Sequence, residues 1–166
     1  YGPNALLKSY ENVAQAAGGA MSTNGFPDRP PVFTSSGIGD SGSGLHCAIG
    51  ILAALRQRDR TGVAPRIEVS MQDAVLNLMR VRYVETLPAG EPVRRTGNRV
   101  WGGPDMVYTC APGGRNYYVT MVIGGDAWDS LLAVTGRAEL IGDERYATDQ
   151  ARAERPEEVT DIVSGW

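Results

Sequence analysis

The stretch Ser35–His46 reads S-S-G-I-G-D-S-G-S-G-L-H and leads directly into an apolar run that ends at Leu55. Its single carboxylate, Asp40, stands among glycines, which adopt backbone angles that other residues avoid and let a ligand approach the main chain closely. Asp is favoured at the start of a helix, where unpaired N–H groups and the positive end of the helix dipole stabilise negative charge. The stretch therefore predicts an acidic side chain on a glycine turn at a helix entrance.

Two roles are open for Asp40 on this pattern alone. An Asp before a helix is most often a cap that accepts a hydrogen bond from the first turn. A carboxylate that a substrate can reach through a glycine turn is also a nucleophile that covalent catalysis can use. The rest of the chain bears on the choice between them.

Helical periodicity is present on both sides of this stretch. Ser70 with Asp73 is typical of a capping box that opens a helix. The expected elements of this half are a helix over Ala5–Ala17, a proline-containing loop over Phe26–Ile38, a helix over Gly44–Arg58, a short strand over Arg66–Val69 and a helix over Met71–Leu87.

The second half of the chain begins with a linker signal, because Pro88, Gly90 and Pro92 interrupt the helical pattern. A hairpin signal follows. The expected elements are strands over Met106–Cys110 and Asn116–Ile123 around the turn Ala111–Gly114, a helix over Ala127–Thr135 capped by Asp126, and a charged, helical tail over Glu139–Trp166.

Composition places the chain among soluble globular proteins and excludes several classes. The 166 residues are 42% hydrophobic and 21% charged, with a formal net charge of −3. That charge gives no basic footprint for nucleic acid, and no apolar run is long enough to cross a membrane. The chain opens at Tyr1 rather than Met, so we expect an internal fragment or a processed chain.

The cysteines and the single histidine predict no metal site. Cys47 and Cys110 lack metal-type spacing, so we expect buried free thiols and a cytoplasmic setting. His46 is the only histidine, which excludes a site with several histidine ligands. A lone His on a helix beside Leu45 is more often packed or capping than catalytic.

Four longer motifs carry a family resemblance. They are Lys8–Gln15 (KSYENVAQ), Gly39–His46 (GDSGSGLH), Ile49–Leu55 (IGILAAL) and Ser70–Asn77 (SMQDAVLN). Together they strongly resemble the class III CoA-transferases, the CaiB/BaiF type, and within that family the formyl-CoA:oxalate enzymes most closely. The likeness is dense from Leu6 to about Arg82 and looser from Arg94 to the end.

The resemblance implies an α/β fold in which a Rossmann-like large domain is joined by a linker helix to a small α+β domain. It assigns residues 1–71 to the second half of the CoA-binding large domain, 72–95 to the linker helix and loop, and 96–166 to an incomplete small domain. Family members form homodimers whose two chains interlock. The family's N-terminal portion, which carries much of the CoA site, is missing from this sequence.

The resemblance also implies an activity, the transfer of CoA from a short acyl-CoA such as formyl-CoA to a carboxylic acid such as oxalate. Asp40 stands at the position of the nucleophile, which forms a mixed anhydride and then an aspartyl-CoA thioester. CoA enters as a thioester substrate and not as a covalently bound cofactor. Other small acids remain open as donor and acceptor.

The remaining site residues follow from the same motifs. The implied catalytic positions are Asp40, Tyr10 and Glu11, and the implied CoA contacts are Leu7, Lys8, Ser9 and Tyr10. Lys8 supplies a cation for the CoA phosphates. Gly102 and Gly103 stand where the formyl-CoA:oxalate enzymes have a longer glycine loop that covers the intermediate.

Two alternatives stand beside the transferase. An acyl-CoA racemase or epimerase of the same superfamily has a histidine where this chain has Tyr10, and a phenol with a pKa near 10 suits proton abstraction poorly at neutral pH. The other alternative is an inactive, truncated family member that serves as a structural unit. The missing N-terminal portion is what favours it.

Overall fold

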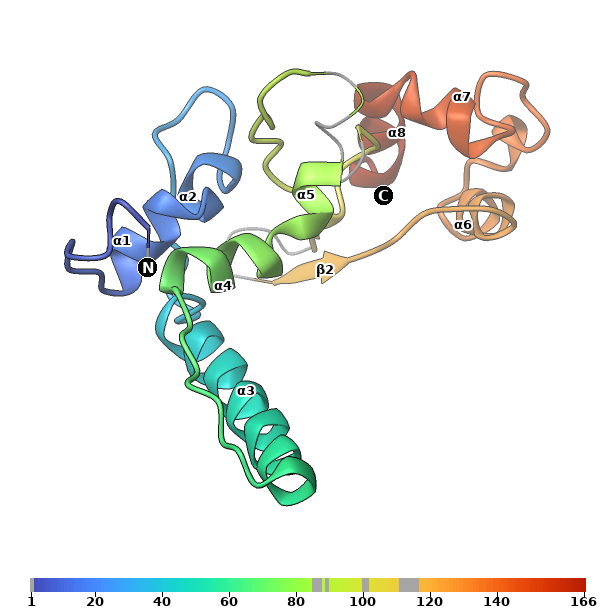
Figure 1. Cartoon of the computed structure of the whole chain (residues 1–166). Helices are drawn as coiled ribbons and strands as arrows, with labels where there is room; N and C mark the ends of the chain where they lie inside the picture. Colours follow the sequence, from blue (N-terminus) through green and yellow to red (C-terminus); the bar gives the residue numbers. More distant parts are fainter. Residues whose placement is uncertain (1, 85–87, 89, 100–101, 111–116) are drawn as a thin grey trace. The chain divides into compact units, whose positions relative to one another are not determined.

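A computed structural model describes residues 2–84, 88, 90–99, 102–110 and 117–166 (Figure 1). The chain divides into two compact units, Tyr1–Gly97 and Asn98–Trp166. In the described residues of the first unit, the regular elements are helices, joined by long irregular segments. The second combines helices with a small antiparallel sheet.

The first helix, α1, spans Glu11–Ala17 and begins later than the sequence predicts. Tyr10 has extended backbone angles, φ −132° and ψ 176°, and residues 3–7 form turns. Leu6 and Leu7 are largely exposed, so no packed apolar surface stabilises a helical turn there. The predicted start at Ala5 is therefore wrong, whereas the predicted end at Ala17 is confirmed.

A short helix, α2 (Ala20–Thr23), follows α1, and both contribute to a small core. This core consists of Ala14, Ala20 and Val75, with Ile38, Met71 and Met79 packed around them. Gly18 lets α1 approach this core, because a β-carbon at Gly18 would lie 2.6 Å from Cγ1 of Val75.

The long helix α3 spans Asp40–Thr61 and contains the predicted segment Gly44–Arg58. It continues past the predicted Arg58 to Thr61, where Gly62 ends it in a left-handed conformation with φ 74°. It begins earlier than predicted, since the glycine- and serine-rich residues after Asp40 are helical. The buried Gly42 explains part of this difference, because a β-carbon there would lie 2.8 Å from Cδ1 of Leu78.

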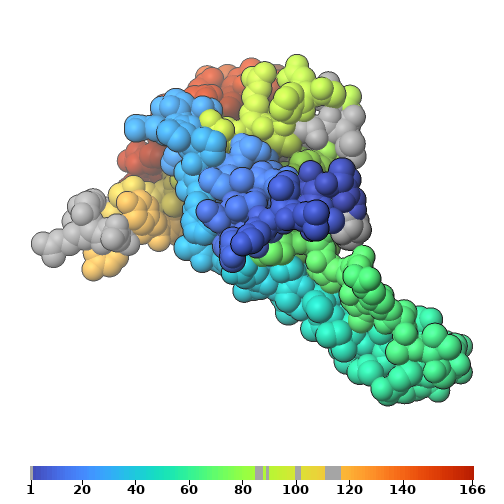
Figure 2. Space-filling model, turned by 60° about the vertical axis from the view of Figure 1, so that its left-hand side comes forward, coloured from blue at the N-terminus to red at the C-terminus, as the bar shows by residue number. Residues whose placement is uncertain are grey.

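The segment Arg66–Val69 is not a strand, so that prediction is wrong. The chain from Gly62 runs back along α3 in an extended form, in cyan and green in Figures 1 and 2. Ile67 packs on α3, because a β-carbon at Gly50 would lie 3.0 Å from its Cγ2 atom. Within the described part of this unit no strand pairs with this segment.

Two helices replace the single helix predicted over Met71–Leu87. They are α4 (Met71–Leu78) and α5 (Arg80–Val84), and residues 85–87 lie outside the described residues. Ser70 caps α4 as predicted, because its hydroxyl accepts the Asp73 N–H at 3.3 Å. Ala74 and Val75 are buried, so α4 presents its apolar face to α1.

The apolar residues of α3 form an exposed row. Leu45, Ile49 and Leu52 lie on one side of the helix and are 66%, 66% and 67% exposed. The far half of α3 and the returning chain extend beyond α1, α2 and α4 in both views. This side of α3 is therefore uncovered by the described residues of its unit.

The second unit opens with the predicted hairpin, whose strands are shorter than expected. Strand β1 (Val107–Thr109) pairs antiparallel with β2 (Tyr118–Thr120), with Tyr108 opposite Val119. The predicted turn Ala111–Gly114 lies outside the described residues.

Helices and loops make up the chain after the hairpin, and the predicted helical tail is helical over 149–153 and 156–164 but not over 141–148. The helical elements are α6 (Ala127–Val134), a 3₁₀ turn η1 (Ala138–Leu140), α7 (Asp149–Ala153) and α8 (Pro156–Ser164). Asp126 precedes α6 but makes no capping bond, so that part of the prediction is wrong. Instead, Asp149 accepts the N–H of Gly125 at 3.0 Å.

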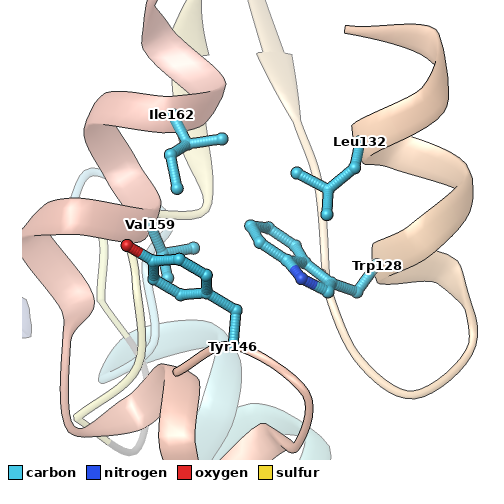
Figure 3. Close-up of a cluster of buried hydrophobic side chains, with 5 residues drawn as sticks. All are labelled: Trp128, Leu132, Tyr146, Val159 and Ile162. Carbon is cyan, nitrogen blue, oxygen red and sulfur yellow. The ribbon is translucent and has the colours of Figure 1, made fainter. Parts of the chain in front are cut away.

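This unit has a core of its own (Figure 3). Five side chains from α6, α8 and the chain between them are buried together: Trp128, Leu132, Tyr146, Val159 and Ile162. The rings of Trp128 and Tyr146 are 6.0 Å apart and tilted by 50°, and Arg152 lies over Trp128 with its guanidinium 5.4 Å from the ring centre. The core fixes α8, whose Thr160 hydroxyl accepts the Asp105 N–H before β1.

Candidate functional site

Asp40 is the first residue of α3 and is exposed. Gly39 holds the N-cap position with helical angles, φ −73° and ψ −59°. As a glycine, it has no side chain that could cap the helix. In the residues that the structure describes, the Asp40 carboxylate makes no hydrogen bond or ion pair. The interpretation of Asp40 as a helix cap is therefore wrong, and its carboxylate is free to meet another group.

Glu11 supplies the capping bonds that Asp40 does not. Its Oε1 atom accepts the Gly39 N–H at 2.9 Å, and its Oε2 atom accepts the Asp40 N–H at 2.7 Å. Burial raises the pKa of Glu11, but hydrogen bonds from Asp40, Gln15 and Gly39 outweigh it and hold that pKa below its ordinary value. An ionised carboxylate on α1 thus fixes the main chain of Asp40 and complements the positive end of α3.

The glycine before Asp40 makes this contact possible. A β-carbon at Gly39 would lie 3.0 Å from Cβ of Ala14 and 3.1 Å from the Glu11 carbonyl oxygen. Gly37, with φ 63°, turns the chain just before it. Gly37 and Gly39 therefore serve the approach of the α3 N-terminus to α1.

A polar residue that the sequence interpretation missed, Gln15, completes this group. Its side chain is fully buried on α1 and bonds Glu11 and the main chain of Thr34. The sequence gives little indication of this role. Gln15 lies one helical turn after Glu11, as many exposed glutamines do, and its partner Thr34 lies in a distant loop. Only the folded chain brings the three together.

The predicted CoA contacts form a second group. Leu7, Lys8 and Ser9 line a cavity of about 510 Å³, between the segment 4–9, the side of α1 and residues 68–72. Tyr10, Glu11 and Asp40 do not line this cavity. Tyr10 connects the two groups along the chain, and its side chain is 67% exposed.

The predicted lid residues belong to the second unit. Gly102 is exposed with φ 73°, and Gly103 is partly buried. Because Asp40 belongs to the first unit, the role of these glycines over an intermediate stays a prediction.

His46 has partners on two helices, and both cysteines are free. The His46 Nδ1–H donates to the Gly42 carbonyl at 2.7 Å, which leaves Nε2 to accept from the Asn77 amide at 2.7 Å. These two contacts join α3 to α4, as those of a packed histidine do. Cys47 and Cys110 are free thiols, as predicted, but they are partly buried rather than buried.

Across residues 2–84, 88, 90–99, 102–110 and 117–166, no three His, Cys, Asp or Glu side chains are grouped as a metal site requires. Among the described helices, none combines the length and apolar character needed to cross a bilayer.

Comparison with known proteins gives the family. A model of CoA-transferase family III matches residues 1–166. The chain belongs to CoA-transferase family III. The family resemblance of the four motifs is thereby confirmed.

Curated relatives of this chain are named formyl-CoA:oxalate CoA-transferase. The protein from Streptomyces coelicolor is 42% identical over 179 residues, which cover 99% of this chain and 44% of that protein. The protein from Shigella sonnei is 41% identical over 170 residues, which cover 90% of this chain and 41% of that protein. The chain therefore spans less than half the length of the curated relatives it matches.

Solved structures show the same fold. A CaiB/BaiF family protein from Brucella suis matches with a TM-score of 0.81 and 28% identity, over 99% of this chain and 43% of that one. A hypothetical protein from Mycobacterium tuberculosis matches with a TM-score of 0.77 and 24% identity, over 98% and 43%, and shows the fold alone. The mixed helical and sheet architecture is thus that of CaiB/BaiF structures.

Proposed function

We propose that the full polypeptide containing this chain transfers CoA from a short acyl-CoA, such as formyl-CoA, to a carboxylic acid such as oxalate, with Asp40 as the nucleophile. One observation carries the proposal: Asp40 presents an exposed carboxylate, with no partner in the described residues, on a main chain that Glu11 holds in place. A carboxylate that capped the helix would accept hydrogen bonds from its first N–H groups, and that of Asp40 accepts none in the described residues. The names of the relatives support the choice of substrates.

The proposed reaction proceeds by covalent catalysis. A carboxylate oxygen of Asp40 attacks the thioester carbonyl, and the C–S bond breaks to give a mixed anhydride and free CoA thiolate. The thiolate attacks the aspartyl carbonyl, which releases formate and leaves an aspartyl-CoA thioester. An oxalate oxygen then attacks the aspartyl carbonyl and expels the thiolate, which finally attacks the oxalyl carbonyl to give oxalyl-CoA and regenerate Asp40.

Each step develops negative charge on an oxygen close to the start of α3. The positive end of this 22-residue helix stabilises such charge without moving. Because Glu11 already occupies the Gly39 and Asp40 N–H groups, we assign it to positioning. Tyr10 is an exposed neighbour of this group and is proposed to face the substrate.

CoA itself is proposed to lie along Leu7, Lys8, Ser9 and Tyr10. The cavity beside the first three, about 510 Å³, is of a size that holds part of such a ligand. The Lys8 ammonium would pair with a CoA phosphate. Gly102 and Gly103 are proposed as the lid over the intermediate, in a glycine loop shorter than that of the formyl-CoA:oxalate enzymes.

The comparisons do not favour the alternatives. The relatives at 41–42% identity are named as transferases, and Tyr10 is a poor base for a racemase at neutral pH.

Larger-scale features of the family are proposed for the full polypeptide. They are a Rossmann-like large domain that includes residues 1–71, a linker over 72–95, a small domain over 96–166, an interlocked homodimer and a cytoplasmic location. The exposed row Leu45, Ile49 and Leu52 supports the dimer, since apolar surface of this kind gains free energy when a second copy covers it.

Mass spectrometry tests the nucleophile. The full polypeptide is incubated with formyl-CoA, its intact mass is measured, and the modified peptide is mapped. We expect an adduct on the peptide that contains Asp40, and its absence from Asp40→Asn, which keeps the size of the side chain and loses the nucleophile. Transfer activity retained by Asp40→Asn would contradict the proposal.

A further inference from the structure

Gln15 is a fully buried polar side chain that the proposed reaction does not use directly. Its Nε2 atom donates to Oε1 of Glu11 at 2.6 Å and to the Thr34 carbonyl at 2.8 Å. Its Oε1 atom accepts the Thr34 N–H at 3.1 Å. A buried amide is costly unless it is hydrogen-bonded, and here both of its donors and its acceptor oxygen are used.

The two bonds to Thr34 anchor the loop that leads to Asp40. This loop follows α2 and has no regular structure from Asn24 to the start of α3. The Gln15 amide pairs with both main-chain groups of Thr34, as the peptide group of a neighbouring strand would. One side chain of α1 thereby fixes the path of the chain shortly before Asp40.

The third bond fixes the carboxylate that holds Asp40. Glu11 needs one orientation in which Oε1 faces Gly39 while Oε2 faces Asp40. The bond from Gln15 to Oε1 favours that orientation. Gln15 therefore acts on Asp40 by two routes, through the loop and through Glu11.

We propose that Gln15 is a positioning residue for the nucleophile, which sets the place of Asp40 by tying Glu11 and Thr34 to one side of α1. The inference rests on the proposed function, in which Asp40 attacks the acyl-CoA. A misplacement of about 1 Å at a reacting group costs on the order of 100-fold in rate. Loss of Gln15 should therefore slow attack by Asp40 much more than it weakens binding of acyl-CoA.

Only a side chain that both donates and accepts fulfils this role. In Gln15→Met the length is kept and the three bonds are lost. In Gln15→Glu an ionised carboxylate faces the Glu11 carboxylate, which raises the pKa of the pair. A proton shared by the pair restores a donor, so Gln15→Glu should regain rate as the pH falls.

The test measures kcat, KM for formyl-CoA and the rate of adduct formation at Asp40 in the full polypeptide. For Gln15→Met we expect kcat to fall by roughly 10- to 100-fold, with KM changed by less than about threefold. For Gln15→Glu we expect kcat to fall by a similar factor at pH 8. Towards pH 6 its kcat should recover in part, relative to that of wild type. A wild-type kcat per folded molecule in Gln15→Met, or a Gln15→Glu profile parallel to wild type, would overturn the proposal.

A matched control separates positioning from general damage. Gln150 on α7 donates to Glu154 at 3.1 Å, which is also a Gln–Glu pair four residues apart. Gln150→Met should keep the wild-type kcat and pH profile. If wild type forms the Asp40 adduct while Gln15→Met stays fast, only the role of Gln15 fails; if activity survives in Asp40→Asn, the proposed function fails.

Discussion

The carboxylate of Glu11 joins α1 to the first residue of α3 and thus bears on both stability and chemistry. Both of its oxygens accept main-chain N–H groups, at 2.9 and 2.7 Å, and Gln15 donates to it as well. Glu11→Gln places an amide donor opposite one of these N–H groups. Hydrogen bonds to a charged group contribute about 1.5–3 kcal/mol when well made. We therefore expect Glu11→Gln to lower the free energy of unfolding by about 1–2 kcal/mol at this partly buried site.

The same group predicts a pH dependence. Because its hydrogen bonds hold the pKa of Glu11 below the ordinary value of about 4.3, its stabilising effect is fully present above that pH and is lost as the pH falls through the lowered pKa. Urea unfolding of the full polypeptide between pH 3 and 7 should show this loss in wild type and less of it in Glu11→Gln. Glu144, exposed and unpaired in the described chain, is the control; an equal loss in Glu144→Gln would contradict the assignment.

Single residues also show what a sequence can and cannot predict here. The glycine turn and the apolar run after it place Asp40 at a helix entrance, because both signals are local. The role of Glu11 as the cap is not local, since 29 positions separate it from Asp40. Gln15 is harder still, because nothing in its neighbourhood distinguishes it from an exposed glutamine before the fold brings Thr34 beside it.

At the scale of elements, the start of α3 depends on its close approach to α1. Gly39→Ala adds a β-carbon 3.0 Å from Ala14 and 3.1 Å from the Glu11 carbonyl oxygen. Overpacking of this kind costs about 1–3 kcal/mol. We expect Gly39→Ala to lower the free energy of unfolding by that amount and to disturb the main chain that carries Asp40.

Gly44 on the same helix provides the comparison. A β-carbon at Gly44 meets no described atom within 4 Å, and Gly in a helix interior is up to about 1 kcal/mol less favourable than Ala. Gly44→Ala should therefore be neutral or stabilising in the same urea titration. If both substitutions lower the free energy of unfolding equally, the close contact with α1 does not explain the effect at Gly39.

Elements with their own boundary signals were predictable, and those that depend on a partner were not. The Ser70 cap of α4 and the Gly62 end of α3 follow from local backbone chemistry. The segment Arg66–Val69 has strand-like composition, but in the described unit it packs along α3 instead of pairing. The start predicted at Ala5 failed for a related reason, since Leu6 and Leu7 have no described surface to pack on.

At the scale of the whole molecule, the exposed side of α3 tests the proposed homodimer. Leu45, Ile49 and Leu52 are each about two-thirds exposed, and full burial of one such side chain contributes about 1.5–3 kcal/mol. In a symmetric dimer each substitution acts in both copies. A charge at Ile49 would be buried without a partner if a second copy covers this row.

We therefore expect Ile49→Glu to shift the full polypeptide from dimer to monomer in light scattering coupled to size-exclusion chromatography. Gln57→Glu adds the same charge to the exposed part of α3 outside the apolar row and should leave the dimer intact. A dimer that survives Ile49→Glu would mean that this row is covered within one polypeptide or stays in solvent. In either case the homodimer would have to be built from another surface, and the apolar row would no longer support it.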